Sequence, residues 1–172
     1  MARALVALSD ALDRLCRRAA SFGIVLMLTL IAIQVVARYV LSSPPAWTEE
    51  GARYAMVWAG FLGAAVAYRQ RLDPTLVALA VFETGALRAL GGALRAVATL
   101  IFLAPIWWYS FFGPNGDPMR GYLARSSGRS TEALGIPMIW FAAALPVAIT
   151  VIFVHVGAAL AARPKPEDLS GG

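Results

Sequence analysis

Long apolar blocks separated by short polar segments dominate the chain. Four blocks are long enough to cross a bilayer, at about residues 19–41, 48–68, 91–112 and 134–162. A helical crossing needs about 20 mostly apolar residues, and a helix satisfies its own backbone hydrogen bonds inside lipid. The pattern therefore predicts an all-α integral membrane protein, with residues 1–172 forming a single four-helix membrane domain.

Two polar segments next to these blocks each allow two interpretations. Residues 3–18 place leucines on one helical face, which indicates either a short amphipathic helix on the inner membrane surface or a frayed polar tail. Residues 74–112 are too long for one crossing. Either an interfacial amphipathic helix over about 74–90 precedes the third crossing, or a single long tilted helix covers the whole segment.

Three local signals refine these boundaries. Thr48 follows a Pro-Pro pair and is a good N-cap for the second crossing. Pro146 lies inside the last apolar block and predicts a kink there. Residues 163–172 combine prolines with charges, which predicts a disordered tail.

The distribution of basic residues predicts the orientation. Four crossings place both termini on one side of the membrane. That side carries eight basic residues before Arg88 and Arg95 are counted, whereas the other side carries five: Arg38, Arg53, Arg120, Arg125 and Arg129. Because basic residues accumulate on the cytoplasmic side, we expect the N- and C-termini to be cytoplasmic.

Composition excludes several classes of function. Charged residues make up 15% of the chain and apolar residues 59%, and the net charge of +5 comes from arginines at the ends of apolar blocks. That distribution indicates contact with lipid and not with nucleic acid. With Cys16 and His155 as its single cysteine and histidine, the chain has too few ligands for a zinc site. We predict no enzyme activity, catalytic residue, metal or cofactor.

The stretch "WTEEGARYAMVWAGFLGAAVAY", residues 47–68, places charge at the mouth of an apolar helix. Glu49 and Glu50 lie in the first turn, and Arg53 is within ion-pairing distance of either along a helix. Arg38 ends the preceding crossing and could fold back to the same level. The four side chains form either a nearly neutral cluster at the outer boundary or an ordinary interfacial charge patch.

Small residues and tryptophans follow within and around this helix. Gly60 and Gly63 belong to a run of small residues that lets another helix, from this chain or a second one, approach closely. Trp58 lies deeper and is expected to be a packing residue. The other tryptophans fall near the predicted outer interface, as in an aromatic belt: Trp47, Trp107, Trp108 and Trp140.

Charge is scarce where a stand-alone transporter needs it. No Asp or Glu lies in the middle of a predicted crossing, whereas ion-coupled transport usually requires ionisable groups near the midplane. Residues 113–131 are polar and are expected to form an external loop. Its arginines could meet an acidic periplasmic partner or be solvated: Arg120, Arg125 and Arg129.

Three motifs in order carry a family resemblance. They are "ARYVL", "WTEEGARYAMVWAGFLGAAVAYRQ" and "ALGIPMIWFAAALP", and they span most of residues 37–147. The set resembles the small membrane subunit (DctQ type) of tripartite ATP-independent periplasmic (TRAP) transporters. Many members of that family have a His-Ile pair after the second helix, where this chain has Leu72-Asp73, so a role of that histidine does not transfer.

The resemblance implies a non-catalytic small permease in the bacterial inner membrane. Such a subunit would scaffold a large multi-helix, elevator-type subunit that carries the sodium and substrate sites. A periplasmic binding protein would deliver the substrate, an organic acid. The alternative is a self-sufficient small four-helix transporter or channel. Candidate subunit-interface residues surround the second helix: Arg38, Trp47, Glu49, Glu50, Arg53, Trp58, Gly60 and Gly63.

Overall fold

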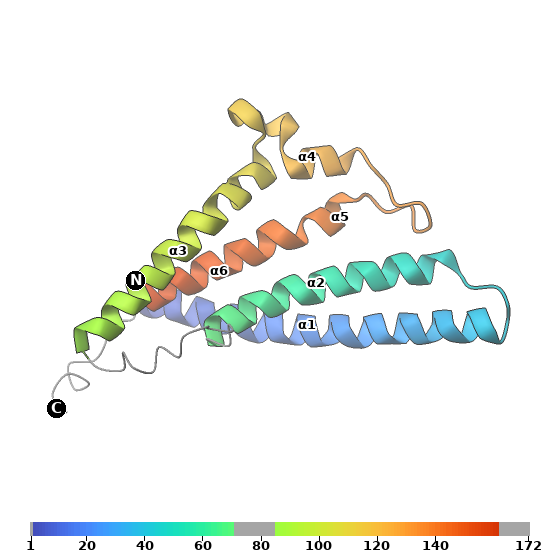
Figure 1. The fold of residues 1–172 in the computed structure, drawn as a ribbon, viewed down its shortest axis with the longest axis horizontal. Helices are drawn as coiled ribbons and strands as arrows, with labels where there is room; N and C mark the ends of the chain where they lie inside the picture. The colour runs from blue at the N-terminus through green and yellow to red at the C-terminus, as the bar shows by residue number, and fades with distance from the viewer. Residues whose placement is uncertain (1, 71–84, 162–172) are drawn as a thin grey trace.

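The computed structural model describes residues 2–70 and 85–161, and these form helices joined by short irregular segments (Figure 1). The first two helices, α1 (Ala2–Tyr39) and α2 (Ala46–Gln70), make a long antiparallel hairpin. The helix α6 (Ala144–Ala161) packs against both of them and against α3 (Gly85–Phe111). The fold is therefore an all-α bundle, as the apolar pattern predicted.

The structure corrects the expectation that residues 3–18 form a separate surface helix or a frayed tail. They are part of α1, which continues without a break for 38 residues. This length corresponds to about 57 Å, well beyond a hydrocarbon core of about 30 Å. The face that packs inward carries small and polar residues, whereas Leu8 and Leu15 are exposed. Leu12, in contrast, packs against the buried core, and Leu5 lies beside Gly157 of α6. The buried residues of this part of α1 are Ser9, Asp13, Cys16 and Ala20.

The start of α2 also differs from the prediction. The helix begins at Ala46, so Thr48 lies within its first turn and is not the N-cap. The Thr48 side chain is fully buried, and its Oγ1 donates a hydrogen bond to the Pro45 carbonyl oxygen at 2.7 Å. The hydroxyl thus closes the turn onto the carbonyl of Pro45 and does not accept from the helix amides.

The α1–α2 contact depends on small side chains. One face of α2 is buried along its length, through Ala52, Ala55, Ala59, Leu62 and Ala65. A Cβ atom added to Gly23 of α1 would lie 3.1 Å from the Ala59 Cβ atom and 3.3 Å from the Ala55 carbonyl oxygen. The two backbones therefore approach closely, as small residues permit in membrane helices.

The last crossing is shorter than expected. Its helix begins at Ile139 and not at residue 134, as α5 (Ile139–Ala142), and continues as α6. The interruption falls at Ala143, three residues before Pro146, and Ala143 keeps helical φ and ψ angles. The kink at Pro146 therefore stays a prediction. Gly135, with φ of +64°, and Pro137 lie in the segment before it, so that segment forms a turn instead of a helix.

The third helix is continuous through the expected boundary near Gly91, because α3 already begins at Gly85. The rest of the predicted interfacial helix, residues 74–84, lies outside the described residues, as does the predicted tail at 163–172. Three helical stretches of the described chain are long and apolar enough to cross a membrane, and these are Ala2–Tyr39, Gly91–Phe111 and Ile139–Ala161. α2 is not among them, so its crossing and the orientation of the termini stay predictions.

The predicted external loop has regular structure. After α3 come two short 3-10 turns, η2 (Pro114–Gly116) and η3 (Pro118–Arg120), then the short helix α4 (Tyr122–Ser127). Gly121 is required here, because a Cβ atom at this position would overlap the Phe111 carbonyl oxygen. Beyond α4 the chain returns to α5 through an isolated bridge between Ser130 and Pro137.

Candidate functional site

The charged cluster at the start of α2 divides into two unequal parts. Glu49 and Arg53 form an ion pair one helical turn apart, and both side chains are at least half exposed, at 50% and 65%. The next acid, Glu50, belongs to a different set of contacts. The expected single cluster of two acids and two arginines does not form among the described residues.

Glu50 binds the backbone of a distant segment. Its Oε1 accepts hydrogen bonds from the amides of Glu132 and Ala133, at 3.0 and 3.1 Å, and its Oε2 accepts one from the amide of Leu134 at 2.8 Å. Three consecutive N–H groups thus converge on one carboxylate. A concave row of amides of this kind favours a negative charge.

Arg38 does not reach these acids. It is exposed, and no ion pair joins it to Glu49 or Glu50 in the described chain. A Cβ atom at Gly51 would lie 3.0 Å from Leu30 Cδ1, so the level of Glu50 on α1 is near Leu30. Arg38 is eight residues further along α1, about 12 Å at the helical rise.

Of the remaining candidates on α2, Trp58 contacts another helix, whereas the others face away from the described chain. The Trp58 indole N–H donates to the Trp140 carbonyl oxygen at 3.0 Å, which joins α2 to α5. Gly60 is exposed, and a Cβ atom at Gly60 or Gly63 would meet no atom within 4 Å. Trp47 is 45% exposed. The small residues of this face therefore have no partner helix in the part of the chain that is described.

The three candidate arginines between α3 and α5 have different surroundings. Arg120 pairs with Asp117 at 3.4 Å, and its side chain is 71% exposed. Arg125 lies in α4 and lines a shallow depression beside Pro105 and Tyr109. Arg129 is exposed, and its carbonyl oxygen accepts from the Met138 amide at 2.8 Å.

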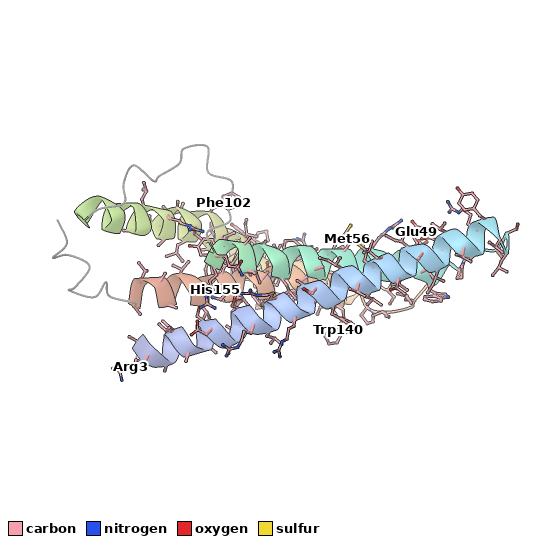
Figure 2. The ribbon with its side chains drawn as sticks, turned by 90° about the horizontal axis from the view of Figure 1, so that it is seen from below. Arg3, Glu49, Met56, Phe102, Trp140 and His155 are labelled. Atoms are coloured by element: carbon pink, nitrogen blue, oxygen red, sulfur yellow. The ribbon has the colours of Figure 1, made fainter. Side chains whose placement is uncertain are left out.

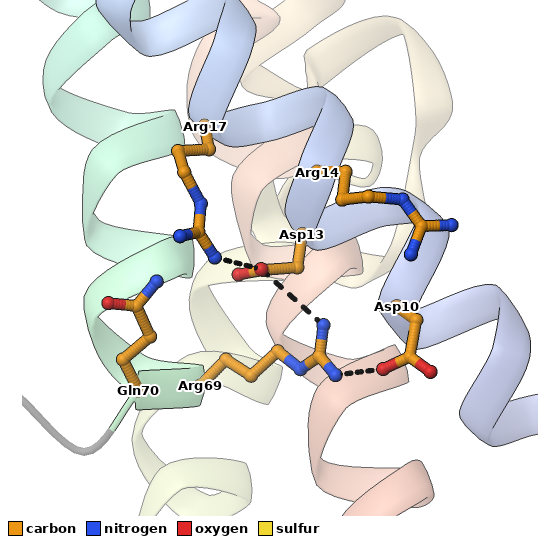
Figure 3. Close-up of a pocket in the computed structure, with 6 residues that line it drawn as sticks. All are labelled: Asp10, Asp13, Arg14, Arg17, Arg69 and Gln70. Atoms are coloured by element: carbon orange, nitrogen blue, oxygen red, sulfur yellow. Dashed lines mark hydrogen bonds and ion pairs between the residues drawn. The ribbon is translucent and has the colours of Figure 1, made fainter.

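A second polar network, which was not predicted, lies at the opposite end of the molecule. Following the predicted orientation, we call the end with this network the inner end and the end with Glu50 the outer end. Arg69, near the end of α2, pairs with Asp10 and reaches Asp13 at 3.6 Å (Figure 3). It also donates to the Ser9 carbonyl oxygen at 3.0 Å. Arg17 pairs with Asp13 at 2.5 Å. Arg69 thus fixes the end of α2 to the first turns of α1.

The network extends to α6 through a buried hydrogen bond. The Ser9 hydroxyl and the His155 Nδ1 atom are 2.7 Å apart, and both residues are 3% exposed. Figure 2 shows His155 in the half of the molecule away from Glu49. Asp13 Oδ1 and His155 Nε2 are buried without a hydrogen-bond partner in the described structure. Three helices therefore meet at one set of polar side chains.

Sequence offered only a weak signal for this network. Ser9, Asp13, Cys16 and Ala20 recur at helical spacing and mark a face of small and polar residues on α1. His155 is 146 residues from Ser9, so no local pattern links them. Among residues 2–70 and 85–161, no three His, Cys, Asp or Glu side chains are grouped as metal ligands would be.

Comparison with models of known protein families identifies the family of this chain. The family model of the DctQ component of tripartite ATP-independent periplasmic transporters matches residues 27–163. The chain belongs to the DctQ family. No curated protein matches it in a sequence search. The chain is thus a membrane component of a tripartite transporter.

The DctQ match covers the two ends of the molecule unequally. Glu50 and the turn that it binds lie wholly within residues 27–163. Of the inner network, Arg69 and His155 lie inside the match, whereas Ser9, Asp10 and Asp13 precede it. The outer contact is therefore formed by DctQ-matched sequence alone, and the inner network also uses the N-terminal part of α1.

Proposed function

We propose that this DctQ chain is the non-catalytic small permease subunit of a sodium-coupled secondary transporter in a bacterial inner membrane. It scaffolds a large, multi-helix, elevator-type subunit that takes up an organic acid delivered by a periplasmic binding protein. The observation that carries the proposal is the family match over residues 27–163. In this proposal α2 crosses the membrane with the other three long helices, and both termini are cytoplasmic.

Two features of the chain support a scaffolding role. The exposed face of α2 carries Met56 and Gly60 and has no partner within the described chain, so a helix of a second protein can approach it closely. On the opposite face, α2 is held by α1 and α6 through packing and the inner polar network. One face is fixed and the other is free to bind.

The proposal is tested by affinity purification of the tagged chain in mild detergent from its native membrane. We expect a much larger membrane protein to co-purify in a fixed ratio. Stable purification of the chain alone would contradict the proposal. Solute uptake by vesicles that contain only this chain would establish the alternative, a self-sufficient small transporter or channel.

A matched pair of variants locates the interface. Gly60→Leu adds bulk to the open face of α2, and Ala32→Leu adds bulk to an exposed position on α1. We expect the first to reduce co-purification of the large subunit several-fold, because close helix approach requires small residues there. The second should leave it unchanged. Equal yields for both variants would remove the open face of α2 from the interface.

A further inference from the structure

Glu50 is fully engaged by backbone donors. Both carboxylate oxygens accept from the three successive amides of Glu132, Ala133 and Leu134. Hydrogen bonds to an ionised acceptor are about twice as strong as neutral ones. Among the described residues, no other side chain accepts hydrogen bonds from so many backbone donors of another segment. The contact joins positions 82 to 84 residues apart, so it fixes the outer segment to α2.

The segment that Glu50 binds is a closed turn. The Thr131 amide donates to the Ile136 carbonyl oxygen at 3.0 Å, and the Ile136 amide donates to Thr131 Oγ1 at 3.1 Å. The bridge between Ser130 and Pro137 closes the turn behind this pair. We call residues 129–138 the outer turn. The outer turn is held internally, and Glu50 binds its tip to α2. At its C-terminal end the turn continues into α5, which Trp58 and Tyr54 of α2 contact through Trp140 and Phe141.

The outer turn also determines where several exposed side chains lie. Arg129 stands at its base, where its carbonyl oxygen accepts from the Met138 amide. Glu132, Ile136 and Pro137 are exposed along it. If the outer turn were released from Glu50, its tip would lose its anchor on α2, while the contacts of α5 with Trp58 and Tyr54 would remain.

We infer that Glu50 is a positioning residue that holds the outer turn on α2, so that Arg129 and the exposed face of the turn present one fixed surface to the soluble binding protein. The inference rests on the proposed function, because it assigns the binding protein as the partner. It differs from an interface role for Glu50, since the carboxylate oxygens already face the chain's own amides. Glu49, its exposed neighbour, supplies a matched control.

Hydrogen–deuterium exchange on the full chain in detergent tests the positioning step directly. In Glu50→Gln we expect the amides of residues 132–134 to exchange at least about ten-fold faster, because a charged acceptor is lost at three donors. Glu49→Gln should leave these amides unchanged, and Glu50→Asp should restore part of their protection. Equal exchange in Glu50→Gln and in the unmodified chain would overturn the inference.

The second measurement uses the assembled transporter in proteoliposomes, with the binding protein titrated at saturating substrate. In Glu50→Gln we expect the binding-protein concentration for half-maximal uptake to rise several-fold, with maximal uptake and yield of the large subunit unchanged. Loss of the large subunit, or a fall in maximal uptake alone, would overturn the inference. If the unmodified chain never binds a large subunit, the proposed function fails, while the exchange experiment still decides whether Glu50 holds the turn.

Discussion

The outer and inner ends of the helix bundle both place acidic side chains beside arginines, yet the two clusters have different surroundings. At the outer end, Glu49 and Arg53 are 50% and 65% exposed and belong to one helix. At the inner end, the Asp13 side chain is 7% exposed and the Arg69 side chain 29%, and they join two helices. The same residue types therefore act locally at one end and between helices at the other.

The packing of the helices explains the difference. At the inner end α1, α2 and α6 converge on a shared core, which contains Cys16, Ala65 and Val156. Figure 1 shows α6 and α3 diverging from the α1–α2 hairpin toward the outer end. Charges enclosed by three helices lose water and depend on one another, whereas charges on a single exposed helix keep their hydration. Substitutions at the inner end should therefore lower the free energy of unfolding more than substitutions at the outer end.

The largest effect is expected from Arg69→Met. Among residues 2–70 and 85–161, this change leaves Asp10 without an ion-pair partner and Asp13 with Arg17 alone. We expect the free energy of unfolding to fall by about 2–3 kcal/mol, less than for a fully enclosed pair because Arg69 is partly exposed. Thermal unfolding of the purified chain in detergent measures the change.

Arg14→Met is the control for Arg69→Met. Arg14 and Arg69 both line a surface depression that also contains Asp10 and Asp13, but Arg14 extends away from the acids and forms no ion pair in the described chain (Figure 3). Its removal should leave the free energy of unfolding within about 0.5 kcal/mol of that of the unmodified protein. Similar losses for both variants would show that general charge, and not the specific network, stabilises the inner end.

A smaller loss is expected from Ser9→Ala. The change removes the partner of His155 Nδ1, and Nε2 already has none in the described structure. A buried polar group left without a partner costs about 1–3 kcal/mol. The double variant Ser9→Ala/His155→Leu should recover most of the loss, because it removes both polar groups. A double variant less stable than Ser9→Ala would contradict this account.

How well the sequence predicted each feature depends on how far apart in the chain the interacting residues lie. The apolar blocks gave the helical class and the approximate hairpin, because membrane crossing constrains length and hydropathy locally. They misplaced the start of the last helix, since Gly135 and Pro137 belong to the outer turn that Glu50 binds. The binding of Glu50 to residues 132–134 spans more than 80 positions, and nothing near Glu50 in the sequence specifies it.

The inner end shows the same limit more strongly. The leucines of residues 3–18 predicted a separate surface helix or a frayed tail, but the segment continues α1 and buries Ser9 and Asp13. Asp13 and Ser9 are tolerated there because Arg69 and His155 arrive from other helices. A polar residue on a packing face can be interpreted only when its partner is known, and the partner of Ser9 lies 146 residues away.

An intermediate position between the two ends is tested by Trp58→Phe. The substitution keeps an aromatic ring but removes the N–H that donates to the Trp140 carbonyl oxygen at 3.0 Å. We expect a loss of about 1 kcal/mol in the free energy of unfolding. Trp47→Phe, at a 45% exposed position, should have no measurable effect. A loss in Trp47→Phe as large as in Trp58→Phe would assign the effect to the indole ring and not to this bond.

The smallest effect is expected at the exposed outer pair. Glu49→Gln and Arg53→Gln should each change stability by less than about 0.5 kcal/mol, because an exposed pair one turn apart on a helix contributes little. A double-mutant cycle on this pair gives its coupling energy, and the same cycle with Asp13→Asn and Arg69→Met gives that of the inner pair. We expect the inner coupling to exceed the outer by at least about 1 kcal/mol. Equal couplings would mean that the burial of Asp13 has no energetic consequence, and the two ends would then differ only in position.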